Sequence, residues 1–430
     1  MKINNIHFVN YKGFKDVKID FNDRLTVIVG DNGGGKTSVL NGLVICFSWI
    51  IARIKNSKGA GLYISENEIS NGERDSEIIA NFDEIEKFII TNRAKSGIVK
   101  KKTNFLENLT SYTSLIQSEI EKKEFLTPLP IFAYYGVRRA VIDVPLRAKN
   151  VNFSLLDTYN SSLNGDANFK SFFQWYRNQE DIENERIRNN IIEISYSSFI
   201  DGKRHMVGSS HIRELNTVRK ALKIFLPHYK NIKVQRSPIK MTIEKDGKKI
   251  FVDQLSDGEK IYIALIGDLC RKLVLANPTL KDPLQGEGIV LIDEIDLHLH
   301  PNWQIEIVPK LIEVFPNVQF IVTTHSPHVI NSVKKENIRI IKNDSDNIEI
   351  SNSDSVYGLP SSIILKDVMG MKNDIPEEVA KQIAKVYELL SKDNFEDVKK
   401  EYFRLVNICS DSPELVRIRK IIEFKFDERL

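Results

Sequence analysis

Apolar residues in the first 55 positions change from strand-like to helix-like spacing. Short apolar runs at 6–11, 17–21 and 25–30 predict three strands, and the last of them, LTVIVG, is continuous enough to be buried on both faces. Residues 37–54, TSVLNGLVICFSWIIARI, are apolar all around a helix and predict a helix packed inside the protein. The chain is therefore expected to begin with strands, a glycine-rich loop and a buried helix.

The later pattern predicts further strands and two helical regions. A helical insertion with mixed charge is expected at about 160–235, a helix from 257, and two helices within 377–427. Strands or hairpins are predicted in EIIANF with EKFIITNR, LPIFAYYGVRR, KMTIEKDGKKIFV, GIVLIDEID, VQFIVTTHS and IRIIKNDSDNIEISN. The expected fold class is α/β, with a mixed sheet, an antiparallel lobe, the helical insertion and a small helical C-terminal tail.

The loop after the third strand has the spacing of a phosphate-binding loop. Residues 30–37, GDNGGGKT, match G-x-x-x-x-G-K-[ST] and lie between a predicted strand and a predicted helix, which a plain glycine turn would not require. Glycines let backbone N–H groups turn toward a phosphate, a lysine neutralises it, and a hydroxyl can bind Mg²⁺. The predicted ATP-binding residues are Asn32, Gly33, Gly34, Gly35, Lys36, Thr37 and Ser38, with Thr37 also a metal ligand.

Two carboxylates end the apolar run at 289–292. Asp293 is predicted to hold Mg²⁺, and Glu294 to polarise the attacking water, because in-line phosphoryl transfer needs an orienting group opposite the leaving phosphate. A carboxylate after a strand can also be an ordinary helix N-cap. The phosphate loop earlier in the chain favours the catalytic interpretation.

Two further motifs complete the set. Ser256, Gly258 and Glu259 belong to LSDGEK before a predicted helix, where a hydroxyl and a glycine can bind an anion, and where serine and glutamate also have capping-box spacing. His325 ends the TTHS run after the next buried strand and is predicted to contact the γ-phosphate. A lone histidine after a strand is usually a surface residue, and only the order of the motifs favours the functional role.

Four motifs follow one another across residues 1 to about 335: the phosphate loop, LSDGEK, the strand that ends in Asp293-Glu294 and the strand that ends in TTHS. Their order resembles that of the ABC/SMC-like ATPases, in which LSDGEK resembles the signature loop. The resemblance implies a P-loop ABC-type head that binds ATP and Mg²⁺ between two copies of itself, because the signature loop of that class acts on the partner's nucleotide. It also implies that Asp296 is the D-loop residue. Lys12, within NYKGF, is similar to a basic residue that contacts phosphate or adenine in RecF- and SMC-type heads.

Two longer segments narrow the resemblance. DEIDLHLHP with TTHSP resembles the OLD-like branch, and QWYRNQEDIENE with YGLPSSIILKDVMG resembles the ATPase subunits of Septu antiphage defence, the PtuA group, including their retron-associated relatives. The resemblance implies an HNH nuclease subunit of the PtuB type as partner and invading nucleic acid, DNA foremost, as target. A RecF-like DNA-repair ATPase without a nuclease partner is the alternative.

Some family features have no clear counterpart here. No glutamine takes the Q-loop position, since Gln117 lies in a polar stretch and the strand end at 134–136 has none. Asp344-Ser345-Asp346 has the spacing of a TOPRIM metal pair, but its segment fits a hairpin better. With no HNH constellation or zinc-ligand spacing, we expect an ATPase that cuts nothing itself.

Composition adds limits on location and partners. Hydrophobic residues make up 42% of the chain, yet no apolar run reaches the roughly 18 residues of a membrane span, and the N-terminus lacks a signal peptide pattern. The three cysteines, scattered and odd in number, favour a reducing cytoplasm. A net charge of +3 does not predict nucleic-acid binding, so any DNA contact must come from local clusters at 100–102, 138–139 and 334–335.

The motifs also predict where the domains divide. Residues 1–335 are expected to form a composite ATPase head and 336–430 a C-terminal hairpin and helical region.

Two further functions are weaker alternatives. One is an effector that damages nucleic acid itself, and the other is a transporter ATPase.

Overall fold

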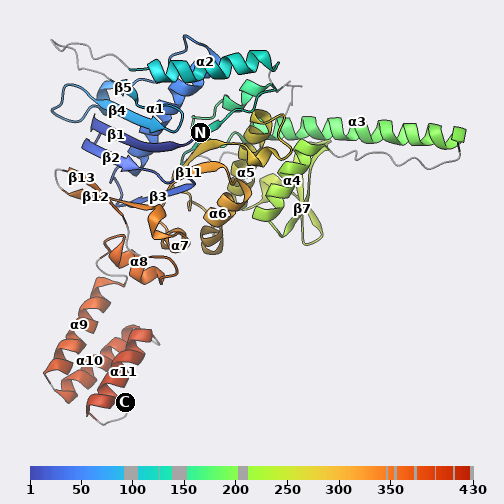
Figure 1. Ribbon diagram of the computed structural model, residues 1–430. Coiled ribbons are helices and arrows are strands. Elements are labelled where there is room, and N and C mark those ends of the chain that lie inside the picture. The colour runs from blue at the N-terminus through green and yellow to red at the C-terminus, as the bar shows by residue number, and fades with distance from the viewer. Residues whose placement is uncertain are drawn as a thin grey trace. The chain divides into compact units, whose positions relative to one another are not determined.

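The computed structural model describes residues 1–91, 105–124, 126–137, 153–201, 212–344, 347–352, 356–371, 375–392, 394–409 and 412–426 (Figure 1). The chain divides into two compact units, Met1–Leu359 and Pro360–Leu430. The first unit holds all the predicted ATP-site residues.

A six-stranded sheet of order β13-β12-β3-β11-β10-β6 forms the centre of the first unit. All neighbouring pairs are parallel except β12 with β13. Every residue of β3, β10 and β11 is buried, as continuous apolar runs require in a sheet covered on both faces. The strands are β3 Leu25–Gly30, β6 Ile131–Tyr135, β10 Gly288–Ile292, β11 Val318–Thr323, β12 Ile338–Asp344 and β13 Asn347–Asn352. The carboxyl ends of β3, β10 and β11 therefore meet at one edge.

An antiparallel sheet of order β2-β1-β4-β5 forms the predicted lobe. Its strands are β1 Ile3–Tyr11, β2 Phe14–Asp20, β4 Glu77–Phe82 and β5 Phe88–Thr91, with a one-turn helix η1 at Glu66–Glu68. Gly42 of α1 (Lys36–Lys55) packs so closely on the Phe8 ring of β1 that a Cβ there would lie 2.3 Å from it. The lobe is thus packed against the helix that follows the phosphate loop.

Helix α1 is long and apolar enough to cross a membrane by composition, but 67% of its most apolar window is buried inside the fold. Its composition matches the predicted internal helix. Helix α2 (Glu107–Lys122) packs beside it, and the Gln117 amide donates to the carbonyls of Arg53 and Ile54, in the last turn of α1.

The predicted insertion is helical except at its end. It contains η2 Leu155–Tyr159, α3 Phe169–Asp201 and α4 Arg213–Phe225, but Tyr229–Arg236 is a strand, β7. β7 pairs with β8 (Ile239–Lys245), which pairs with β9 (Lys248–Phe251), so the predicted hairpin is part of a three-stranded sheet. Helix α3 has 33 residues, about 50 Å at 1.5 Å per residue, and projects from the head in Figure 1.

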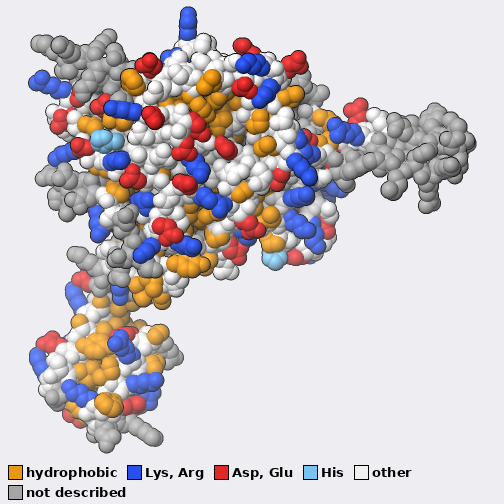
Figure 2. Space-filling view, viewed as in Figure 1, with side chains coloured by type: hydrophobic (Ala, Val, Ile, Leu, Met, Phe, Trp, Pro, Cys, Tyr) orange, Lys and Arg blue, Asp and Glu red, His pale blue; other side chains and the backbone are white. Residues whose placement is uncertain are grey.

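The remaining elements of the first unit surround the carboxyl edge of the central sheet or connect its strands. They are α5 Asp257–Ala276, α6 Pro301–Val314, α7 Pro327–Asn331 and the short η3 Val252–Gln254, η4 Pro283–Gln285 and η5 Lys335–Asn337. Basic and acidic side chains are mixed over the face of this unit in Figure 2, as the near-balanced charge predicts.

The described residues of the second unit form four helices: α8 Ser361–Asp367, α9 Glu377–Ser391, α10 Phe395–Ile408 and α11 Pro413–Phe426. Three of them share a core that includes Val386, Val398, Leu405, Ile418 and Ile422. The two helices expected in 377–427 are therefore joined by a third, α10. The hairpin at 338–352 pairs with β3, so it belongs to the first unit and not, as expected, with the C-terminal helices.

A buried cluster of charges fixes α5 to the central sheet. Asp268 is fully buried, and its carboxylate accepts from Arg271 (2.8 Å), from Lys272 and from the Tyr135 hydroxyl of β6 (3.0 Å). Burial alone would raise the pKa of Asp268, but Lys272 and Arg271 hold it at about 2. One carboxylate thus compensates two buried cations and one buried hydroxyl.

Replacement of Asp268 by Asn should lower the free energy of unfolding of the first unit by about 3 to 5 kcal/mol, because two buried cations lose their anion. Asp257→Asn, an exposed site on the same helix, should cost about 0.5 kcal/mol or less. Urea unfolding followed by tryptophan fluorescence measures this, since Trp49, Trp175 and Trp303 all lie in the first unit. Equal stability of the two variants would contradict the role given to Asp268.

Candidate functional site

The loop between β3 and α1 has the geometry of a phosphate cradle. Gly33 (φ +77°) and Gly35 (φ +101°) adopt left-handed conformations that other residues rarely take, and Gly35 is the N-cap of α1. Asn32 and Gly34 complete the turn, and Thr37 and Ser38 lie in the first turn of α1. The loop thus lies at the positive end of a long helix, whose first N–H groups have no partner within the helix itself.

Lys36 lies inside this loop. Its ammonium donates to the carbonyl of Gly30 (2.8 Å) and to that of Asp31 (2.9 Å), and the residue is 6% exposed. Burial lowers the pKa of Lys36, while the nearby carboxylates of Glu294 and Asp293 oppose the shift. A cation held by two backbone carbonyls can exchange them for phosphate oxygens without leaving the loop.

Asp293 joins three elements at the carboxyl edge of the sheet. One carboxylate oxygen accepts from the Thr37 hydroxyl of α1 (2.9 Å), and the other accepts from the Thr323 hydroxyl of β11 (2.5 Å). Its own N–H donates to the carbonyl of Tyr135, at the end of β6 (2.8 Å). The side chain is therefore fixed toward the phosphate loop, as predicted for a carboxylate after the DE strand.

Glu294 follows in a left-handed conformation, with φ +46°. Its N–H donates to the Thr323 hydroxyl at 2.8 Å, which holds this uncommon backbone in place. Asp296, two residues on, accepts from the Thr324 hydroxyl at 2.5 Å. Two consecutive threonines, the last residue of β11 and the one after it, thus fix the two ends of the turn that contains Glu294.

His325 is half-buried and feels the charges of Lys36, Glu294 and Asp296. Burial lowers its pKa below 6.5, the positive charge of Lys36 lowers it further, and Glu294 and Asp296 oppose the shift. These effects together favour the neutral form of the imidazole. A neutral ring has one nitrogen that donates a hydrogen bond and one that accepts.

These residues fit Mg-ATP. Hard oxygen ligands suit Mg²⁺, and the Thr37 hydroxyl and Asp293 carboxylate lie within hydrogen-bond distance beside the phosphate loop. When bound, Mg²⁺ would neutralise charge on the phosphates; Thr37 and Asp293 would hold it, and Lys36 would hold the phosphates. The roles of the individual residues stay predictions, whereas their convergence is a feature of the structure.

The signature segment begins α5 with a capping box. The Ser256 hydroxyl accepts from the Glu259 N–H (3.4 Å), and the Glu259 carboxylate accepts from the Ser256 N–H (2.8 Å). Glu259 also accepts from Lys245 (3.0 Å) and from the Tyr229 hydroxyl. Burial would raise the pKa of Glu259, but the hydrogen bonds of Tyr229, Ser256 and Lys245 hold it at about 2. The capping interpretation of this motif is therefore correct, whatever else the loop binds.

Gly258 has a packing reason to be glycine. A Cβ at this position would lie 2.5 Å from the His298 carbonyl, in the segment that follows Asp296. The signature loop and this segment of the same chain are thus in direct backbone contact.

Other predicted residues have partners outside the phosphate loop, and the nucleotide contact of Lys12 stays a prediction. Lys12 forms an ion pair with Glu68 (3.3 Å) in the antiparallel lobe and lies over the Tyr11 ring. Gln117 lies at the far end of α1, about 25 Å or more along that helix from the loop, so it cannot be the Q-loop residue. The basic clusters at 100–102 and 138–139, like Ser345 and Asp346, lie outside the described residues.

Thr323 and Thr324 are the residues that the sequence interpretation missed, although both lie within the TTHS motif. Within that motif, only the histidine that follows them pointed to a functional role. Tyr229 and Lys245 are distant in sequence from Glu259 and could not be found by motif.

Comparisons with known proteins agree with this geometry. The family model described as "AAA ATPase domain" matches residues 1–330. The retron Ec83 probable ATPase of Escherichia coli is 31% identical over 91% of this chain and 80% of its own, and the retron Vc95 probable ATPase of Vibrio cholerae is 32% identical over 79% and 73%. The Septu protein PtuA of Bacillus thuringiensis is 28% identical over 44% of this chain and 49% of its own.

Replacement of Thr323 by Val should slow ATP hydrolysis by about 10- to 100-fold, because the isosteric side chain supports neither Asp293 nor the Glu294 N–H. Thr323→Ser keeps the hydroxyl and should stay within about threefold of the unmodified rate. Steady-state phosphate release at saturating ATP measures both. A Val variant as active as the Ser variant would show that the hydroxyl has no part in positioning the two carboxylates.

Proposed function

The chain belongs to the AAA ATPase domain family and is an ATPase related to those of retrons, and from this premise we propose that it is the ATP-driven regulatory subunit of an antiphage defence complex. ATP joins two heads, hydrolysis through Glu294 separates them, and the state of the heads controls a partner HNH nuclease. The relatives named retron ATPase and Septu PtuA support the defence role.

One observation carries the ATPase part of the proposal, namely the bond between the Thr37 hydroxyl and Asp293. It joins the phosphate loop to the strand end that carries Glu294, so the predicted metal ligands and the predicted base lie at one edge of one sheet. Glu294 would orient a water for in-line attack, and Lys36 and neutral His325 would stabilise charge on the γ-phosphate.

The signature loop supports the dimer that we propose. Ser256 starts a helix of 20 residues whose N-terminus is suited to an anion, and its capping partner Glu259 is fixed within its own chain. In the ABC/SMC-like class this loop meets the nucleotide of the second head. We place Ser256 and Gly258 against the γ-phosphate bound by the partner head, with Asp296 beside the shared interface.

Glu294→Gln should bind ATP, hydrolyse it about 10²- to 10⁴-fold more slowly, and form a dimer in ATP that is absent in ADP. Light scattering after size-exclusion chromatography measures the mass in each nucleotide. Addition of Ser256→Arg should abolish this dimer while leaving ATP binding by the same chain intact. An identical mass for Glu294→Gln in ATP and ADP would contradict the ATP-dependent dimer.

Lys36→Ala should remove protection against phage in a host that carries the chain with its neighbouring genes, since the loop loses its cation. Plaque counts measure protection, and capture of tagged Glu294→Gln protein from that host, followed by mass spectrometry, identifies the partner. Recovery of an HNH nuclease supports the proposal. Full protection by Lys36→Ala, or recovery with recombination proteins alone, would favour the RecF-like repair ATPase.

A further inference from the structure

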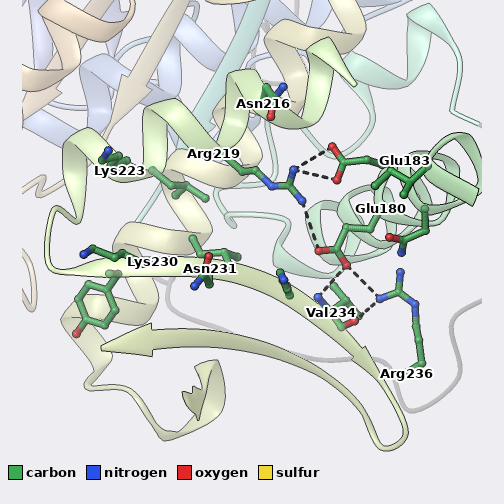
Figure 3. A pocket seen from close by; sticks show the side chains of 15 residues that line it. Glu180, Glu183, Asn216, Arg219, Lys223, Lys230, Asn231, Val234 and Arg236 are labelled. Carbon is green, nitrogen blue, oxygen red and sulfur yellow. Dashed lines mark hydrogen bonds and ion pairs between the residues drawn. The ribbon is translucent and has the colours of Figure 1, made fainter. Parts of the chain in front are cut away.

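A cleft of about 740 Å³ lies between α3, α4 and β7, away from the phosphate loop in sequence and built from other elements. Figure 3 shows its lining. Five of the lining side chains are basic and two are acidic, and three of the basic ones are exposed lysines: Lys223, Lys230 and Lys233. The cleft therefore has an excess of positive charge.

Both acidic side chains are already compensated within the cleft wall. Arg219 pairs with Glu183 (2.9 Å) and approaches Glu180 (3.9 Å), and Arg236 pairs with Glu180 (3.1 Å). Glu180 also accepts from the Val234 N–H at 2.9 Å. In Figure 3 these pairs form one side of the cleft, and Lys223 and Lys230 lie toward the other. The glutamates and arginines thus form the structural wall, which joins α3 to α4 and β7.

The lysines have no such partners. Within the described part of the chain, none of Lys223, Lys230 and Lys233 forms an ion pair. Of the apolar residues that line the cleft, Leu222, Ile232 and Val234 are 1%, 9% and 5% exposed, and Ile187 is partly exposed. Lysine ammonium groups are suited to phosphates as mobile point charges.

The cleft is also connected to the signature loop. Tyr229 lines it, and the Tyr229 hydroxyl donates to the carboxylate of Glu259, which caps Ser256. The base of α3 packs on the same helix, because Phe172 leaves no space for a Cβ at Gly267 of α5. A ligand that moves β7 would therefore act on the start of α5 through one hydrogen bond, and one that moves α3 would act on the middle of α5 through a packed contact.

We propose that this cleft binds the phosphate backbone of a nucleic acid through Lys223, Lys230 and Lys233, and that Tyr229 transmits its occupancy to the signature loop. The regulatory half of this inference rests on the proposed function; the binding half does not. Recognition through three lysines to backbone phosphates would be independent of base sequence and sensitive to salt.

Binding is tested first, without ATP, on the full chain with a fluorescein-labelled 20-base-pair DNA of arbitrary sequence and its single strand. The variant K223Q/K230Q/K233Q should bind the duplex at least tenfold more weakly at about 0.1 M salt, and the slope of log affinity against log salt should fall by about 2 to 3. The control K15Q/K58Q/K122Q removes equal charge from exposed lysines outside the cleft and should change both quantities little.

Equal losses in the two triple variants would overturn the assignment. Poly-glutamate is added at a charge equal to that of the DNA. If it displaces the DNA from the unmodified protein and this displacement is lost in the cleft variant alone, the cleft binds an acidic polypeptide instead, and the proposal is overturned. Preference for the duplex or for the single strand defines the form of nucleic acid and supports the cleft in either case. Thermal melting of both variants shows whether either loses its fold.

The link to the signature loop is tested with Tyr229→Phe, which keeps the ring and removes the hydroxyl. DNA should change the ATP hydrolysis rate of the unmodified protein at least twofold, and the Phe variant should bind DNA equally well but lose this response. An unchanged response in Tyr229→Phe would overturn the link. A chain without any ATPase activity would contradict the proposed function instead and leave the binding measurement intact.

Discussion

Asp293 accepts hydroxyl hydrogen bonds from Thr37 and Thr323, and the remainder of the site depends on this pair. The two donors come from elements nearly 290 residues apart in sequence, and only the parallel order β3-β11-β10 brings them to one carboxylate. A buried carboxylate is costly unless its oxygens are paired, so the two threonines stabilise both its charge and its direction. Thr323 then holds the turn at Glu294 as well, which makes the two carboxylates one geometric unit.

Tyr135 connects this unit to the signature helix. Its carbonyl accepts from the Asp293 N–H, and its hydroxyl donates to Asp268 inside α5. Asp268 with Arg271 and Lys272 forms a buried charge cluster, an arrangement that an apolar core of similar volume often matches or exceeds in stability. Its value here is specificity, since it fixes the position of α5 relative to β6, and thereby relates the signature loop to the strand ends that hold the site.

Much of the site could be predicted from sequence because its parts are local. The phosphate loop, the DE strand and the TTHS strand each consist of an apolar run followed by a short motif, and parallel strands bring such ends together. Strand β7 was missed because a bulge between Lys230 and Lys233 interrupts its alternation. Helix α10 could have been predicted, because Val398, Tyr402 and Leu405 have helical spacing after the N-cap Asn394. The pairing of Ile340 with Val29, and that of Lys12 with Glu68, depend on tertiary contacts that no local pattern reveals.

The position of β3 in the sheet also shapes how the chain can fold. Its neighbours are β11 and β12, which begin at residues 318 and 338, so the strand that carries the phosphate loop has no partner while most of the head is being synthesised. Helix α1, which is apolar on all sides, follows β3 directly and is exposed over the same period. Strands this far apart in sequence lose loop-closure entropy before they gain any contact, so their pairing is slow. Until they pair, the apolar segments are exposed and can aggregate. The nucleotide loop is thus the first functional element to be made and among the last to take shape, and a chaperone that shields the first 55 residues during synthesis would protect them over this interval.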